Sequence, residues 1–153
     1  GMIDHVSFEE ISYNALPYKF EAGTPNVGGA IGLNAAIDYV NSVGMHNIIS
    51  YEKELTGYAM SKMRNIAGIK FFGTSEDKDP IISFNIDGIH HYDLSTLLDG
   101  FGIALRSGHH CAQPLMKRLN VDGTLRASFA FYNTFEELDY FIEKINIASD
   151  MLR

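Results

Sequence analysis

The spacing of apolar residues predicts two consecutive helices in the first half of the chain. Apolar positions recur at the i, i+3, i+4, i+7 spacing of one helical face, at Leu33, Ala36, Ile37 and Val40. Thr24 can cap this helix with Pro25 at its first position, and Gly44 ends it. A second helix is predicted over residues 47–66, with Gly68 as its terminator. Its buried stripe consists of Ile48, Tyr51, Leu55, Ala59, Met63 and Ile66.

The pattern changes from a helical to a strand period at residue 69. Short runs rich in β-forming residues predict strands over 69–72 and 81–86, joined by a polar connection. A third, brief strand is predicted over 103–105, and alternating apolar positions predict a fourth over 125–131. A short helix before the third strand has the stripe Leu94, Leu97, Leu98 and Phe101, and Gly100 or Gly102 closes it.

The last segment predicts a helix with a clear start. Thr134 and Glu137 form a capping box, and the helix stripe that follows is Leu138, Phe141, Ile142, Ile145, Ala148 and Leu152. Helices followed by mixed strands and helices predict an α+β fold, in which helices pack on an antiparallel or mixed sheet of about four strands. The first 25 residues are expected to be irregular. We therefore predict an N-terminal arm, 1–25, that packs on another domain or subunit, and a domain over 26–153.

Composition narrows the classes of function. Of the 153 residues, 46% are hydrophobic and 20% are charged, which is ordinary for a globular domain. The net charge of −7 argues against a nucleic-acid partner, which requires a basic surface, and against an anionic membrane. No apolar run approaches the roughly 20 residues that span a bilayer. A single cysteine cannot form an internal disulfide, which fits a cytoplasmic protein.

That single cysteine, Cys111, is the strongest candidate for chemistry. A lone cysteine is most often a small buried hydrophobe. Here polar residues flank it, Gly108 permits unusual backbone angles, and neither helical nor strand periodicity continues through the segment. Nearby positive charge favours the thiolate, which is the nucleophilic form of cysteine. The sequence therefore predicts a reactive thiol on a mobile loop.

Two arginines and two histidines accompany this cysteine. Arg126 lies on the strand face opposite the apolar residues, so it is either a surface residue or a bidentate clamp for a carboxylate. Arg106 either favours the thiolate or forms a structural ion pair. His109 and His110 are adjacent, so they cannot easily join Cys111 on one tetrahedral ion, and no metal site is expected. One of them can relay protons near physiological pH, and the sequence does not say which.

Three segments carry a resemblance to a known family. They are Phe-Glu-Ala-Gly-Thr-Pro-Asn at 20–26, Arg-x-Gly-His-His-Cys-Ala at 106–112, and Arg-Ala-Ser-Phe-Ala-Phe-Tyr-Asn-Thr at 126–134. In this order they resemble the SufS-type (group II) cysteine desulfurases of the class V aminotransferase family, which are fold-type I enzymes dependent on pyridoxal phosphate. The resemblance implies the small C-terminal domain of such an enzyme.

The resemblance also implies roles for individual residues. Cys111 attacks the sulfur of a cysteine substrate bound to the cofactor and becomes a persulfide, the substrate becomes alanine, and the sulfur serves iron–sulfur cluster assembly. Arg126 binds the substrate carboxylate, and Arg106 supports substrate and persulfide. Gly23 and Thr24 reach the cofactor phosphate of the partner subunit in a homodimer. Backbone N–H groups at a helix N-terminus give that contact a physical basis, and simple capping by Thr24 is compatible with it.

One part of the family pattern is absent from the sequence. The lysine that holds the cofactor as a Schiff base lies in a His-Lys pair, and none of the seven lysines here follows a histidine. The resemblance therefore implies a C-terminal fragment of a polypeptide whose large domain binds the cofactor. Alone, this fragment is expected not to turn over cysteine. Gly1 before Met2 is either a tag remnant or a native residue.

Two alternatives remain open at this point. The parent protein can instead be a selenocysteine lyase or another class V aminotransferase-like enzyme. From a different class, the chain can be a stand-alone sulfur carrier or interaction module. The apolar residues of the arm favour a missing partner surface: Phe8, Ile11, Tyr13, Leu16 and Phe20. Tyr92, before Asp93, stands where resembled enzymes with a zinc-bound acceptor carry histidine, which favours an acceptor protein of SufE type.

Overall fold

A computed structural model describes all 153 residues, which form two compact units, 1–44 and 45–153. In the first unit, β1 (Ile3–Val6) and β2 (Ile11–Tyr13) pair as an antiparallel hairpin, and a 3-10 turn, η1 (Tyr18–Phe20), follows. Ser7 closes the hairpin by accepting hydrogen bonds from the N–H groups of Glu9 and Glu10. The prediction that residues 1–25 are irregular is therefore wrong, because strands of three and four residues are too short for alternation to be recognised.

Helix α1 (Val27–Val43) completes this unit, and it begins later than predicted. Asn26 is its N-cap, since the side chain accepts a hydrogen bond of 3.0 Å from the N–H of Gly29. Asparagine is among the best capping residues, so the prediction of Thr24 as the cap is wrong. Gly44 ends the helix as predicted, at φ 90°. No residue of α1 is buried, the predicted apolar face included.

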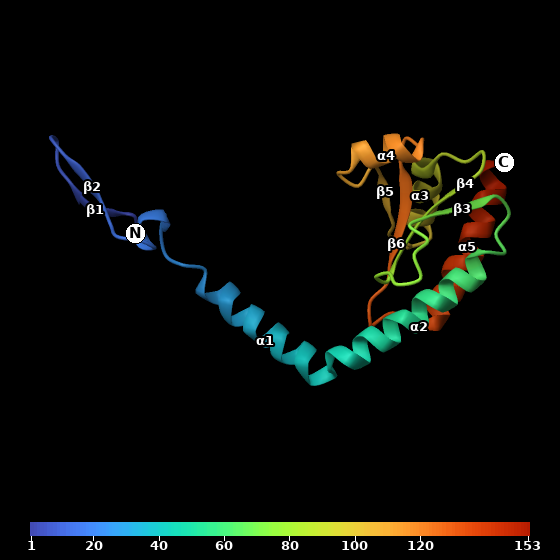
Figure 1. The fold of residues 1–153 in the computed structure, drawn as a ribbon, viewed down its shortest axis with the longest axis horizontal. Coiled ribbons are helices and arrows are strands. Elements are labelled where there is room, and N and C mark those ends of the chain that lie inside the picture. Colours follow the sequence, from blue (N-terminus) through green and yellow to red (C-terminus); the bar gives the residue numbers. More distant parts are fainter. The chain divides into compact units, whose positions relative to one another are not determined.

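The second unit begins with α2 (Met45–Met63) and contains the sheet. Its four strands are β3 (Ile69–Phe72), β4 (Ile81–Ile86), β5 (Arg106–Gly108) and β6 (Thr124–Ser128). They are antiparallel throughout, in the order β3-β4-β6-β5, which confirms the predicted α+β sheet (Figure 1). The remaining helices are α3 (His91–Gly100), α4 (Gln113–Leu119) and α5 (Phe135–Leu152).

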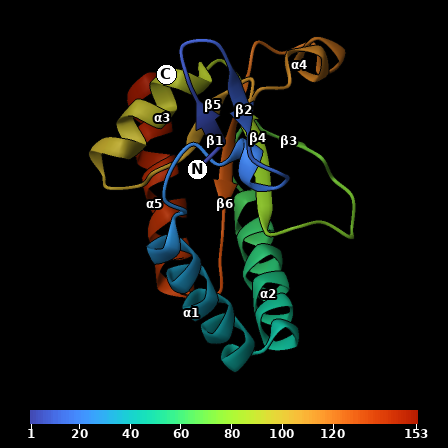
Figure 2. The same ribbon diagram turned by 90° about the vertical axis from the view of Figure 1, so that its left-hand side faces the viewer.

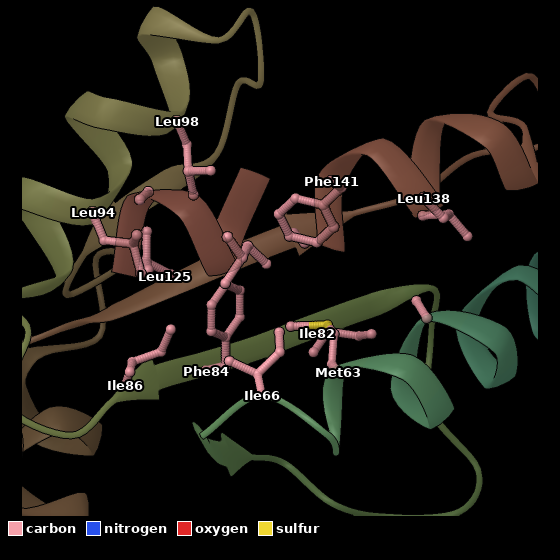
Figure 3. Close-up of a cluster of buried hydrophobic side chains, with 14 of the residues drawn as sticks. Met63, Ile66, Ile82, Phe84, Ile86, Leu94, Leu98, Leu125, Leu138 and Phe141 are labelled. Atoms are coloured by element: carbon pink, nitrogen blue, oxygen red, sulfur yellow. The ribbon is translucent and has the colours of Figure 1, made fainter. Parts of the chain in front are cut away.

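Three helices cover one face of this sheet. The core combines the inward residues of β4 and β6 with the apolar stripes of α2, α3 and α5, as Figure 3 shows. The predicted stripe of α2 is confirmed, with Leu55, Ala59 and Met63 fully buried. Phe84 lies in the middle of the core, and its ring packs edge-on against Phe141 at a centroid distance of 6.3 Å. Burying each such side chain contributes about 1.5–3 kcal/mol.

The opposite face of the sheet carries polar side chains. Successive side chains of a strand alternate between faces, so Ser83 and Asn85 of β4 and Arg126 of β6 point away from the core. Helix α4 lies at the end of the sheet far from the start of α2 in both ribbon views (Figures 1 and 2). The polar face and this end of the sheet position the candidate site.

Local predictions near the site hold only in part. The strand predicted over 103–105 is wrong: Ile103 and Leu105 pack on the core, and pairing with β6 begins only at Arg106. Strand β6 is shorter than the predicted 125–131 at its C-terminal end. The capping box of Thr134 and Glu137 is confirmed. Helix α4 was not predicted, because seven residues give too few apolar repeats.

None of the five α-helices combines the length and the apolar character that crossing a membrane requires.

Candidate functional site

The segment that carries Cys111 leaves β5 through an unusual backbone conformation. Gly108, the last residue of β5, has φ 113°. His110 and Cys111 follow at φ 54° and 60°, in the left-handed region that residues other than glycine adopt uncommonly. The N–H of Ala112 donates a hydrogen bond of 2.8 Å to the carbonyl of His109, which closes the turn before α4. Such backbone strain is typical of functional sites.

This turn brings the thiol back to the strand from which the loop starts. Cys111 is a free, exposed cysteine, and the guanidinium Nη2 of Arg106 donates to its Sγ at 3.4 Å. A guanidinium carries a permanent positive charge, so the sulfur of Cys111 lies in contact with a cation. The structure therefore brings together the two residues that the sequence analysis placed in one reactive loop.

Arg106 also lies beside the second predicted arginine. In the ladder between β5 and β6, Arg106 is the direct partner of Arg126. Like charges directly opposite each other destabilise a sheet. The Nε atom of Arg126 is buried and has no hydrogen-bond partner, although an unsatisfied buried donor is costly. The two guanidinium groups thus provide a place where an anion would be stabilised.

His110 turns away from its neighbour and binds β6. Its Nε2 lies 3.0 Å from the carbonyl oxygen of Thr124 and 2.9 Å from the hydroxyl of the same residue. A carbonyl only accepts, so Nε2 carries the proton, and in the neutral ring Nδ1 is an acceptor. Nδ1 is buried and has no partner.

Electrostatics keep this ring neutral. Burial lowers the pKa of His110, and the positive charges of Arg126 and Arg106 lower it further, while the hydrogen bond to the Thr124 carbonyl opposes them. An imidazole with a bare Nδ1 can accept a proton.

His109 has different surroundings. It is exposed and lines a hollow of about 430 Å³ together with residues of α4 and the turn after it, among them Gln113, Met116 and Lys117. The structure therefore separates the two histidines that the sequence presents as a pair. No group of three or more His, Cys, Asp or Glu side chains that could hold a metal ion occurs in the chain.

A set of contacts that the sequence did not predict lies behind the loop. His90 caps α3, since its side chain accepts a hydrogen bond from the N–H of Tyr92. His91, however, reaches the hydroxyl of Ser107 through Nδ1 at 2.7 Å. Asn85 donates a hydrogen bond of 2.9 Å to the carbonyl of Gly123. The only available signal was the amide of Asn85 in a strand that is apolar apart from this residue and Ser83.

Gly23 and Thr24 belong to the first unit, where both are exposed. They precede the capping residue of α1, and a Cβ atom at Gly23 would meet no atom within 4 Å. Their backbone is therefore accessible within the first unit.

Comparison with known proteins agrees with the motifs. Residues 1–141 match the family described as aminotransferase class-V. A probable cysteine desulfurase of Xylella fastidiosa (strain 9a5c) is 50% identical over 141 residues, which are 92% of this chain and 34% of that protein. A probable cysteine desulfurase of Staphylococcus aureus (strain Mu50 / ATCC 700699) is 48% identical over 145 residues, 94% of this chain and 35% of that protein.

A solved structure shows the same arrangement of elements. The crystal structure of the cysteine desulfurase CsdA (S-sulfonic acid) from Escherichia coli superposes with a TM-score of 0.85 at 39% identity, over 99% of this chain and 38% of that one. The chain thus spans about a third of the length of the curated relatives described above.

Proposed function

Because the chain belongs to the aminotransferase class V family, we propose that it is the small C-terminal domain of a SufS-type cysteine desulfurase. The parent enzyme would move sulfur from L-cysteine to Cys111 and release alanine. One observation carries the proposal: an exposed thiol lies at 3.4 Å from the Arg106 guanidinium, which is itself the ladder partner of Arg126. The chain spans about a third of its relatives, so turnover would belong to a longer polypeptide with a large cofactor-binding domain.

Pyridoxal phosphate is the cofactor of this family, and when bound it acts as an electron sink for the amino acid substrate. The lysines of this chain do not fit the role of its covalent anchor. Six of the seven already have side-chain or backbone partners, and Lys117 lies in α4. The six are Lys19, Lys53, Lys62, Lys70, Lys78 and Lys144. The contribution of this chain would be the backbone of Gly23 and Thr24, which would bind the cofactor phosphate of the partner subunit in a homodimer.

Arg126 would bind the substrate carboxylate. Guanidinium and carboxylate groups form two parallel hydrogen bonds, and the buried Nε without a partner is a donor that such a ligand can satisfy. The carboxylate would also relieve the repulsion between Arg126 and Arg106. Substrate binding and the electrostatics of the sheet would therefore favour the same geometry.

Cys111 would act as the nucleophile. Its thiolate, held by Arg106, attacks the sulfur of the substrate, and a bond forms between the two sulfur atoms. The bond between the substrate carbon and its sulfur breaks, and the electron pair stays with the carbon. A proton then converts that carbon into the methyl group of alanine, and Cys111 remains as a persulfide.

The two histidines would divide the proton transfers. His110 would accept a proton at its unpartnered Nδ1 only transiently, because burial and the charges of Arg126 and Arg106 lower the pKa of the ring. His109 is exposed, so it would exchange protons between the loop and solvent. The different surroundings of the two rings support this assignment.

The persulfide would be handed to an acceptor protein. Cys111 is exposed on its turn, which an acceptor thiol needs in order to reach the sulfur. Tyr92, 64% exposed, stands before Asp93 at the position that favours a SufE-type acceptor over a zinc-bound one. The sulfur would then serve iron–sulfur cluster assembly in the cytoplasm.

The test is sulfide release from L-cysteine by the full-length polypeptide, with reductant and acceptor, before and after Cys111→Ala. Turnover that requires Cys111 supports the desulfurase. Absence of sulfide release, or full activity of the variant, overturns it. The 153-residue chain alone is the negative control. Parallel assays with selenocysteine identify a lyase, since selenium leaves more readily and its release depends less on Cys111.

A further inference from the structure

Helix α3 reaches the strand that starts the cysteine loop. His91 is the first residue of α3, and its Nδ1 lies 2.7 Å from the hydroxyl of Ser107. Ser107 is the middle residue of β5, between Arg106 and Gly108. Strand β5 has three residues and lies at the edge of the sheet, where only β6 pairs with it. The bond from His91 therefore fixes a strand that has a short ladder on one side and none on the other.

Tight packing around Gly123 supports the same strand, β5, next to His91. A Cβ atom added to Gly123 would lie 2.5 Å from Nε2 of His91 and 2.9 Å from the Cα of Gly108. The imidazole, Gly108 and Gly123 thus meet without room for one further carbon. Asn85 holds this point from β4 through its hydrogen bond to the carbonyl of Gly123.

We propose that His91 is a positioning residue for the Cys111 loop. By holding Ser107, it keeps Arg106 where its guanidinium donates to the sulfur of Cys111. His91 acts through β5 and has no part in the chemistry. The importance of this role for sulfur transfer rests on the proposed function, whereas the geometry that it maintains is a property of the chain.

The contacts of the neighbouring residues make this role specific to His91. The cap of α3 is provided by His90, so the imidazole of His91 is not needed to start the helix. Arg106 and Cys111 are both exposed, and a single exposed contact is too weak to hold two side chains in one geometry by itself. The contact between them therefore depends on how firmly β5 is held.

Alkylation of the thiol measures this dependence directly, because Cys111 is the only cysteine of the chain. The rate of reaction with iodoacetamide at pH 7 is measured for the 153-residue chain with and without Arg106→Gln, in the wild-type and in the His91→Ala background. In the wild type, Arg106→Gln is expected to slow alkylation about two- to fivefold, the range of an exposed charged pair. In the His91→Ala background this factor is expected to fall to about one, because the two effects couple.

Two further variants separate positioning from a general loss of structure. His91→Asn places an amide where Nδ1 binds Ser107, so the full Arg106 effect is expected to return. His90→Asn, the matched control, keeps the helix cap and is expected to retain the wild-type factor. Ser107→Ala removes the other partner of the bond. If circular dichroism shows that His91→Ala does not fold, the effect of Arg106→Gln on the alkylation rate is measured in the Ser107→Ala background instead.

The outcomes decide the proposal without any turnover assay. An equal Arg106 effect in the wild-type and His91→Ala backgrounds overturns it. So does the absence of any Arg106 effect in the wild type, since no contact would then remain for His91 to maintain. Failure of sulfide release by the full-length polypeptide would overturn the proposed function and leave this result unchanged.

Discussion

Arg106 and Arg126 face each other directly across the ladder between β5 and β6, and Ser83 of β4 continues the same row on the other side of Arg126. The ion pairs of the chain include neither arginine. Two positive charges in directly opposed positions repel each other, and no acidic side chain compensates them. The repulsion between the two arginines therefore destabilises the sheet at the position where the substrate carboxylate is proposed to bind.

This repulsion predicts that removing one charge stabilises the domain. Arg106→Gln is expected to raise the free energy of unfolding by about 0.2–1 kcal/mol, the range of cross-strand pairs, in urea unfolding at low salt. The gain should shrink at high salt, because mobile ions screen the repulsion in the wild type. Arg64→Gln, an exposed arginine outside the sheet, serves as the control. Lower stability of Arg106→Gln would show that the two charges do not repel significantly.

The pKa of His110 predicts how stability changes with pH. Burial and the charges of Arg126, Arg106 and His109 place this pKa below the ordinary 6.5, so below about pH 6.5 the unfolded chain binds more protons than the folded one. The contribution of His110 to the free energy of unfolding is therefore fully present above about pH 6.5, and it decreases as the pH falls below that value. The pKa of His91 is lowered too, by burial and by His90, and it acts in the same direction.

The variant His110→Gln isolates the contribution of His110. Glutamine can still donate to the Thr124 carbonyl, but it has no proton to gain in acid. Urea unfolding at pH 7.5 and pH 5.5 is expected to show a smaller loss of stability for His110→Gln than for the wild type. The remaining loss belongs to His91 and to other groups. Identical losses in the two proteins would contradict the assignment of His110 as a neutral, Nε2-protonated ring.

The sequence predicted the elements whose signals are local. Each of these signals depends on residues that are close together in the sequence. The confirmed predictions are the stripe of α2, the strands over 69–72 and 81–86, and the capping box of α5. The strand predicted over 103–105 failed because pairing with β6, not local apolar character, decides where β5 begins. The stripe of α1 has the correct period, although no residue of this helix is buried.

In the site, too, the sequence predicted relations between residues that are close along the chain and missed those between distant residues. Arg106 and Cys111 are five residues apart, and the composition of their loop indicated a shared role that the contact between them supports. The bond between His91 and Ser107 joins residues 16 positions apart, and the bond between Asn85 and Gly123 joins residues 38 positions apart. Such contacts depend on the register of four strands, and a pattern along the chain carries no information about that register.

The packing point behind the loop predicts opposite effects of alanine at two glycines. Gly123→Ala is expected to destabilise the domain by about 1–3 kcal/mol, because its Cβ would meet the backbone of Gly108, which cannot move as a flexible side chain can. Gly57→Ala, in an exposed part of α2 with no atom within 4 Å of the new Cβ, is expected to stabilise it by about 0.5–1 kcal/mol. Urea unfolding of the two variants measures both. An unchanged free energy of unfolding in Gly123→Ala would show that the backbone of β5 moves enough to accommodate the new Cβ atom.

The distribution of buried residues predicts that the second unit folds without the first. Every buried residue of the chain lies after residue 47, and no residue of 1–44 is buried. A protein of residues 45–153, which begins with Met45, is therefore expected to unfold cooperatively with a free energy within about 0.5 kcal/mol of that of the whole chain. A chain that ends at Asn133 is the contrasting control: it loses α5, with the buried Leu138, Phe141 and Ile145, and should not fold. Loss of cooperative unfolding in 45–153 would show that residues 1–44 stabilise the domain.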